Sequence, residues 1–115
     1  MTTNTSRTLR YLRDHGYKAE VVEKYLSFAK RRKDLFDIID IIAIDGKNIL
    51  GVQSCSGSTF AEHDKKIIAC PAATLWLASG GLLWLIGWRK KKLFRGSKAV
   101  RWEERIKEYQ LKGVK

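Results

Sequence analysis

The sequence predicts an α/β domain in which helices flank a mixed central sheet of about four strands. Short apolar runs at residues 38–42, 49–52 and 82–88 have the length and composition of buried strands. Residues 5–15 and 59–69 instead carry the spacing or the capping residues of helices. The expected order of elements along the chain is α-β-β-β-α-α-β-α.

The first half of the chain should begin with a helix and a strand. The helix covers residues 5–15, where apolar side chains recur at helical spacing, and Gly16 supplies a natural end. Residues 17–28 alternate in the manner of a strand, which we expect to present Glu23 on one face.

A hairpin is expected to connect the next two strands. Residues 45–48, Asp-Gly-Lys-Asn, lie between the apolar segments 38–44 and 49–53, and Asp-Gly accepts the positive φ that two-residue turns demand. A hairpin at this point places Asp40 and Gln53 side by side on adjacent strands.

The second half is expected to hold two helices, a strand and a last helix. Thr59 and Glu62 have the spacing of a capping box, so a helix should begin there and continue to about residue 69. A short helix at 72–78 and a glycine turn precede the strand at 82–88. The last helix is predicted from residues at positions i, i+4 and i+7, namely Trp102, Ile106 and Tyr109.

Residues 67–88 carry no formal charge, and this run of 22 residues is long enough to span a bilayer. Pro71 and the pair Gly80-Gly81 divide it, and basic residues flank both ends, so the positive-inside rule assigns no orientation. We therefore predict no contact with a membrane. A small membrane-associated basic protein is the third of three functional hypotheses.

Length and charge narrow the class of protein. With 115 residues, the chain is expected to form one domain over residues 1–115. Its net charge of +11 favours a polyanionic partner, either nucleic acid or an anionic membrane surface. Two cysteines supply neither a disulfide framework nor a four-ligand zinc site. The polar, basic N-terminus has no apolar signal segment, so we expect an intracellular location, the host cytoplasm if the protein is viral.

Asp40 is the most informative residue of the chain. It lies among the isoleucines of residues 38–42, where a carboxylate without a partner is expensive. Beside the amide oxygen of Gln53, and in a chain this basic, it suggests a divalent-metal site next to a phosphate-binding surface. This combination predicts a nuclease.

Five segments together resemble a known family. They are Arg-Arg-Lys-Asp-Leu-Phe (31–36), Ile-Asp-Ile-Ile-Ala-Ile (39–44), Leu-Gly-Val-Gln (50–53), Lys-Ile (66–67) and Gly-Trp-Arg-Lys (87–90). Through them, residues 17–90 resemble small phage-type proteins of the PD-(D/E)xK nuclease superfamily, in their Holliday-junction-resolvase-like branch. The resemblance implies a restriction-endonuclease-like core and a DNA endonuclease that prefers branched or junction DNA.

The resemblance also assigns roles to residues of this chain. Asp40 takes the place of the motif's metal-binding Asp, and Gln53 that of its second acid. Together with the carbonyl of Ser54 they would hold Mg²⁺ or Mn²⁺, and Glu23 would supply a further acid. No organic cofactor is implied.

One position departs from the family pattern. Cys55 falls where the motif has a lysine, which helps to orient the water that attacks the phosphodiester. We expect Lys66, on the following helix, to take over this role.

Basic clusters are expected to contact the DNA phosphates without reading sequence. The predicted DNA-binding residues are Arg31, Arg32, Lys33, Lys65, Arg89, Lys90 and Lys91. Because two strands must be cut and each chain supplies one site, a symmetric homodimer is expected, with residues 82–88 or the first helix as the contact surface.

Each site residue also has a simpler interpretation. Asp40 could form a structural ion pair with Arg31 or Arg32, and Gln53 could satisfy backbone groups at a strand end. Glu23 and Lys66 could be solvated surface residues. Asp34 and Asp37 are interpreted as loop acids that could also support or bind a metal.

Two further alternatives concern the chemistry. Cys55 and His63 lack a third group that would orient them as a nucleophilic pair. The second functional hypothesis is a nuclease-fold protein that binds DNA without cutting it, because Gln53 and Cys55 stand where the family has an acid and a lysine.

Overall fold

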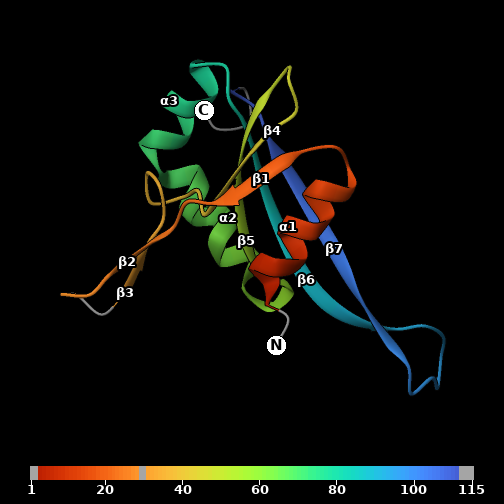
Figure 1. Cartoon of the computed structure of the whole chain (residues 1–115). Helices are drawn as coiled ribbons and strands as arrows, with labels where there is room; N and C mark the ends of the chain where they lie inside the picture. Colours follow the sequence, from red (N-terminus) through yellow and green to blue (C-terminus); the bar gives the residue numbers. More distant parts are fainter. Residues whose placement is uncertain (1–2, 29–30, 112–115) are drawn as a thin grey trace.

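The computed structural model describes residues 3–28 and 31–111, with the side chains of residues 24–26 and 31–32 outside the description (Figure 1). Within these residues the α/β class is confirmed, with helices α1 to α3 and strands β1 to β7. Their bounds are Asn4–Asp14 (α1), Lys18–Val21 (β1), Lys24–Leu26 (β2), Arg31–Lys33 (β3), Ile41–Ile44 (β4), Ile49–Ser56 (β5), Phe60–Ala69 (α2), Pro71–Ala78 (α3), Leu82–Lys92 (β6) and Val100–Tyr109 (β7).

The central sheet has five strands in the order β1-β4-β5-β6-β7, one more than predicted. Neighbouring strands are antiparallel except for β5 and β6, which run parallel. Parallel neighbours need a long crossover, and α2 with α3 provides it. Strands β2 and β3 pair with each other in a separate two-stranded ribbon.

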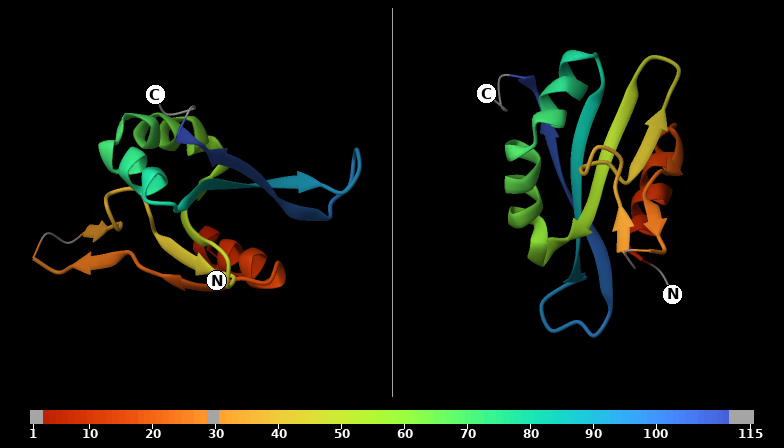
Figure 2. Two further views of the ribbon diagram at one scale, coloured as in Figure 1. Left: turned by 90° about the horizontal axis from the view of Figure 1, so that it is seen from above. Right: turned by 90° about the vertical axis from the view of Figure 1, so that its left-hand side faces the viewer.

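The sheet separates two apolar cores. Helix α1 covers one face, and α2 and α3 cover the other (Figure 2). Because successive strand residues point to opposite faces, β5 gives Leu50 and Val52 to the core under α1 and Cys55 to the core under α2. Gln53 shares the face of Cys55, which places it on the side of α2 and α3.

The predicted hairpin between β4 and β5 is confirmed. Ile44 pairs with Ile49, and the carboxylate of Asp45 accepts hydrogen bonds from the amides of Lys47 (3.0 Å) and Asn48 (2.8 Å). Gly46 has a φ of 92°, which a residue without Cβ adopts at little cost. The turn therefore fixes the register of the two strands.

The three helices predicted before strand β6 are all present, but one begins differently from the prediction. The helix at residues 5–15 and the short helix at 72–78 are confirmed as α1 and α3. The helix after Thr59 is also confirmed, but its capping box does not form. A 3₁₀ turn, Gly57–Thr59, precedes α2, and the Thr59 hydroxyl bonds to Ser56 instead of capping the helix.

The predicted C-terminal helix is wrong, because these residues form strand β7. Strand β7 pairs with β6 from Leu83↔Tyr109 to Lys92↔Val100. Without this partner, the second edge of the long strand β6 would have unpaired backbone groups. The gain in backbone pairing overrides the helical spacing of three side chains.

The single strand predicted at residues 17–28 is two strands. The amide of Val22 donates to the carbonyl of Asp40 (2.9 Å), and Val22 packs against the core under α2 and α3. After Val22 the chain leaves the sheet and enters β2, so Glu23 lies in the break rather than within a strand.

Strand β6 lies between β5 and β7, so residues 82–88 offer no free strand edge as the predicted dimer contact.

Within the described part of the chain, no helix combines the length and the apolar character that crossing a membrane would require. The uncharged run 67–88 is instead divided among the end of α2, α3, a glycine turn and β6.

Two ribbons extend away from the body of the domain at opposite ends (Figure 2). One is β2 with β3, and the other is the distal part of β6 with β7. They raise the radius of gyration to 15.0 Å, compared with about 13 Å for a compact domain of this length.

Candidate metal site

Asp40 and Gln53 lie side by side, as the predicted hairpin requires. The Asp40 amide donates to the carbonyl of Val52 (3.0 Å), which continues the β4–β5 register by one residue. Gln53 Nε2 then donates to Asp40 Oδ2 at 3.2 Å. Both side chains are 4% exposed. The sequence predicts Asp40 within a strand. In the structure it lies immediately before the first residue of β4.

A tight loop brings Asp34 to the same place. Leu35 and Ile39 exchange backbone hydrogen bonds, at 2.7 and 2.9 Å, which closes the loop. Phe36 and Asp37 both adopt positive φ, 55° and 66°, a conformation that costs roughly 1 kcal/mol or more per non-glycine residue. This strained reversal lets Asp34 Oδ2 accept a hydrogen bond from Gln53 Nε2 at 3.2 Å.

Glu23 completes a cluster of three acids. The bond from Val22 to the Asp40 carbonyl holds the end of β1 beside Asp40, and Glu23 is the next residue. One carboxylate oxygen from each of Glu23, Asp34 and Asp40 lies within 4.8 Å of the other two. The acid cluster, as we call these three residues, therefore joins β1, the loop after β3 and the start of β4.

The environment of Asp40 favours its protonated form. Burial raises the pKa of Asp40 to about 7, and the nearby charges of Asp34 and Glu23 act in the same direction. Hydrogen bonds from the Ser54 amide, at 3.1 and 3.3 Å, oppose the shift. A cation that binds among these acids would therefore compete with the proton that burial favours on Asp40.

The amide oxygen of Gln53 is buried and has no hydrogen-bond donor within the described part of the chain. Its Nε2 atom serves both Asp34 and Asp40. An unpaired buried acceptor costs about 1–3 kcal/mol. Rotating the amide by 180° would point Oε1 at two carboxylates, which is favourable only if a cation lies among them.

A buried polar network supports this strand from the other face of the sheet. The Thr8 hydroxyl of α1 lies 2.9 Å from Ser54 Oγ and accepts a hydrogen bond from Trp88 Nε1 at 2.8 Å. Thr8 is fully buried. The network fixes Ser54, whose amide bonds to Asp40. Ser54 thus contacts the cluster through its backbone amide. That its carbonyl binds a metal stays a prediction.

Among the described side chains, none lies in the site as a substitute for the lysine that the resemblance implies. Cys55 is buried beside Phe60 and Gly87, and burial raises its pKa to about 11, so its thiol is neutral. Lys65 and Lys66 are exposed on α2. Among the described residues, neither makes a hydrogen bond or ion pair with the acid cluster. His63 Nδ1 lies 2.9 Å from the Thr59 carbonyl, so no nucleophilic pair with Cys55 is built.

Except for Lys65 on α2, the predicted DNA-binding residues lie on the two ribbons. Lys33 is exposed at the end of β3, whereas the side chains of Arg31 and Arg32 lie outside the described residues, as does their proposed pairing with Asp40. Arg89, Lys90 and Lys91 are exposed on β6.

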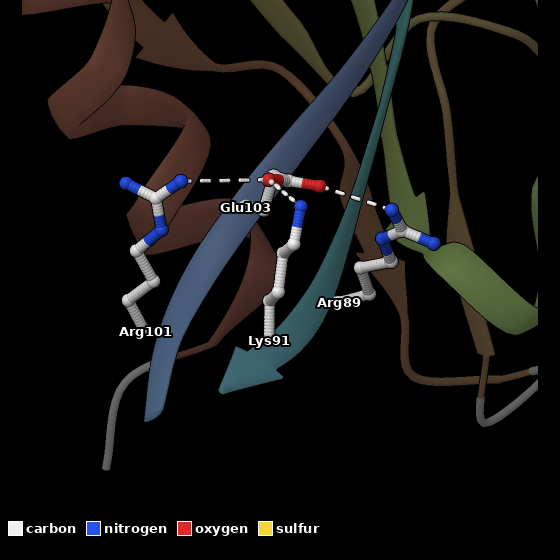
Figure 3. Close-up of polar contacts among 4 residues, drawn as sticks. All are labelled: Arg89, Lys91, Arg101 and Glu103. Atoms are coloured by element: carbon white, nitrogen blue, oxygen red, sulfur yellow. Dashed lines mark hydrogen bonds and ion pairs between the residues drawn. The ribbon is translucent and has the colours of Figure 1, made fainter. Parts of the chain in front are cut away.

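Glu103 gathers three of the cations of the second ribbon (Figure 3). Its carboxylate accepts from Arg89 at 3.0 Å and Lys91 at 3.3 Å, and it lies 3.6 Å from Arg101. These hydrogen bonds from Arg89 and Lys91 lower the pKa of Glu103. Sequence reasoning did not identify Glu103, because the pairing of β6 with β7 was not predicted.

The sequence predicts Asp34 to be a loop acid near the start of a strand, with a possible metal role, and does not place it beside Asp40. Its position six residues before Asp40, on the far side of a possible chain reversal, is the only signal that would have indicated it. Asp37 is exposed and is not part of the cluster.

No family model, curated protein or solved structure matches this chain.

Proposed function

We propose that the protein is a divalent-metal-dependent DNA endonuclease of the PD-(D/E)xK type, acting on branched or junction DNA. The observation that carries the proposal is the acid cluster built around the buried amide of Gln53. Two strand ends and a strained loop bring the three acids together, and a bound cation would offset the repulsion among carboxylates held this close.

The donor set suits a hard cation. Glu23, Asp34 and Asp40 offer carboxylate oxygens, and Gln53 would add its amide oxygen after a 180° rotation. Oxygen-only ligands favour Mg²⁺ or Mn²⁺ over zinc or copper. In this proposal Asp34 joins the residues expected from the sequence, and the Gln53 oxygen, which has no hydrogen-bond donor among the described residues, becomes a metal ligand.

The order of elements supports the same family. Without the β2–β3 ribbon and the terminal strand β7, the chain reads α1, β1, β4, β5, α2 with α3, and β6. This order, α-β-β-β-α-β, is the part of the predicted order that precedes the last helix, with the two consecutive helices counted as one. The site lies at the β4–β5 hairpin, where the resemblance puts its metal-binding Asp and its second acid.

The chain's own residues would divide the work as follows. The metal, when bound, supplies charge that stabilises the phosphorane-like transition state and activates water. Glu23, Asp34, Asp40 and Gln53 hold it, and Lys33 and Arg89 would contact phosphates on either side. Lys66 is the proposed replacement for the motif lysine, because α2 covers the sheet face that carries Gln53. A symmetric dimer would supply the second site, with α1 as the remaining proposed contact.

Cleavage of a matched panel of labelled DNAs tests this function. Single strands, duplexes, flaps and four-way junctions would be incubated with Mg²⁺, Mn²⁺ or EDTA. The wild type should give metal-dependent products, with the junction or flap preferred, and Asp37→Asn should match it because Asp37 is exposed outside the cluster. Asp40→Asn should give none. Equal activity of Asp40→Asn and wild type would rule out this site.

The neutral thiol of Cys55 favours one alternative, a nuclease-fold DNA-binding protein with impaired catalysis. In that case Cys55→Lys should restore a cation on the face of Gln53 and raise the cleavage rate by about tenfold or more. The longer side chain should also cost about 1–3 kcal/mol of unfolding free energy, because Phe60 and Gly87 surround the position.

Cys55→Met is the control for this prediction, because methionine has a similar length and no charge. Single-turnover cleavage of the same DNA panel would compare the two variants. A rate gain with lysine alone would identify position 55 as a vacated lysine site. Equal rates for both variants and the wild type would mean that the missing lysine does not limit catalysis.

A further inference from the structure

The distal part of the β6–β7 ribbon is the most strongly charged element of the described chain. Residues 89–101, which we call the basic arm, contain seven cations and no acid. The cations are Arg89, Lys90, Lys91, Lys92, Arg95, Lys98 and Arg101. The arm projects beyond the rest of the domain (Figure 1). The single carboxylate of Glu103 faces three of the cations, Arg89, Lys91 and Arg101, and so offsets only part of this charge. Like charges held this close repel one another, so a polyanionic partner would stabilise the arm.

The arm is an ordered ribbon with a defined turn. Its strands pair up to Lys92↔Val100, and the amide of Leu93 donates to the carbonyl of Ala99 at 3.3 Å. Ser97 is buried within the turn, where its hydroxyl donates to the Ala99 carbonyl and its amide donates to the Phe94 carbonyl. The position of the tip is therefore set by hydrogen bonds.

One face of the basic arm continues the face that carries the acid cluster. Gln53 pairs with Leu85, and side chains at alternate positions share a face, so Arg89 and Lys91 lie on the side of Gln53. Arg101 is the partner of Lys91 and shares this side. At about 3.3 Å per residue, Lys92 lies roughly 23 Å along β6 from Leu85.

The tip of this cationic ribbon is apolar. Leu93 is 57% exposed and Phe94 is 68% exposed. By contrast, Trp102 at the base of the arm is covered by the guanidinium of Arg7, 3.5 Å from its ring centroid. Within the described part of the chain, nothing covers the two tip residues to this extent, although exposing two adjacent large apolar side chains on a charged element is unfavourable.

We propose that the basic arm lies along a DNA groove and inserts Phe94, with Leu93, between bases at a distorted or branched step. A two-stranded ribbon fits the major groove, and apolar side chains at the end of a cationic element unstack base steps. The arm would hold a distortion within about one helical turn of the acid cluster. This inference rests on the proposed function, because it takes DNA as the partner and explains a preference for branched substrates.

The charges favour DNA over a lipid surface. Cations occupy both faces of the arm, whereas its exposed large apolar residues are three, Leu93 and Phe94 at the tip and Val100 in the last strand pair. Stable membrane attachment needs a much larger apolar surface. Phosphates on both sides of a groove match the distribution of the cations.

Binding in EDTA separates this inference from cleavage. Wild type, Phe94→Ala and Leu75→Ala would be titrated with a four-way junction and a continuous duplex, each carrying 2-aminopurine. Leu75 is the matched control, because it is an apolar residue of α3 with 69% exposure. Wild type and Leu75→Ala should raise 2-aminopurine fluorescence at the junction. Phe94→Ala should lose this signal and about tenfold in junction affinity, with little change for the duplex.

A second variant tests the ribbon itself. Lys91→Ala with Arg101→Ala should weaken binding to both DNAs and reduce the salt slope by about 1.8. The proposal is overturned if Phe94→Ala matches wild type in junction affinity and fluorescence. It is also overturned if Phe94→Ala alters only binding to vesicles of phosphatidylcholine and phosphatidylglycerol. Cleavage that depends on Asp40 but not on Phe94 would reject the wedge alone, and a Phe94 effect without Asp40-dependent cleavage would reject the nuclease alone.

Discussion

Asp40→Asn is expected to stabilise the metal-free protein and to abolish metal-dependent cleavage. Burial raises the pKa of Asp40 from 3.8 to about 7, so the folded state binds a proton more tightly than the unfolded chain does. Stability should therefore fall as the pH rises from about 4 to 7, by about 4 kcal/mol in the limit set by this shift. Asparagine removes that dependence.

The net gain should be smaller than this limit, about 1–3 kcal/mol at pH 8, because asparagine keeps only part of the hydrogen bonding of Asp40 with Ser54 and Gln53. Below about pH 4 the difference between the variant and the wild type should disappear, since Asp40 is then protonated in both the folded and the unfolded chain. Urea denaturation in EDTA at about pH 3.5 and pH 8 would measure both values.

Magnesium should reverse the order of stability of the wild type and Asp40→Asn, so that the wild type becomes the more stable protein. The wild type should gain stability with Mg²⁺, more at pH 8 than at pH 6, because the metal displaces the proton of Asp40. The variant should gain little, and its cleavage rate should drop by about 10³-fold or more. A variant that is less stable than wild type in EDTA at pH 8 would show that the charge of Asp40 stabilises the fold, as in a structural ion pair, instead of opposing it.

Ile39→Ala is expected to cause the largest loss of stability, about 3–5 kcal/mol. Ile39 is fully buried, and its Cδ1 atom lies 2.6 Å from the position that a Cβ of Gly51 would take. Glycine cannot fill the space that alanine leaves, so the cavity should persist. Ile49→Ala, on a 42% exposed residue of the same sheet, should cost about 1 kcal/mol or less.

The double variant sharpens this test. Gly51→Ala alone should destabilise the protein by about 1–3 kcal/mol, because its methyl group would collide with Ile39 and lie 3.2 Å from Trp76. In the Ile39→Ala background the same methyl group should fit into the cavity. The two costs should therefore fail to add by about 1 kcal/mol or more in chemical denaturation. Additive costs would show that the core relaxes around Ile39 instead.

The pairing of Asp40 with Gln53 could be predicted because it depends on local signals. The Asp-Gly turn and the two isoleucine-rich runs fix the hairpin register within a short stretch of chain. The remaining acids of the site depend on longer-range geometry. Asp34 reaches the cluster through two consecutive positive φ values at Phe36 and Asp37, and neither residue type signals that conformation.

The error at the C-terminus has a different cause. Trp102 and Ile106 lie on one face of β7 and Tyr109 on the other, so their spacing fits a helix only by coincidence. Strand β7 has charged residues on both faces and no regular alternation. Pairing with strand β6 decides its structure, as is typical of edge strands. The residues of β7 alone therefore could not predict it.

The hairpin and the crossover differ in the length of chain that each must close. Strands β4 and β5 are neighbours in sequence, whereas the parallel pairing of β5 with β6 encloses α2 and α3. Hairpins form in about 1–10 μs, and pairings across long segments form later. During folding, Asp40 and Gln53 should therefore meet while both are still hydrated. The removal of water from the acid would then accompany the docking of the two helices, late in folding.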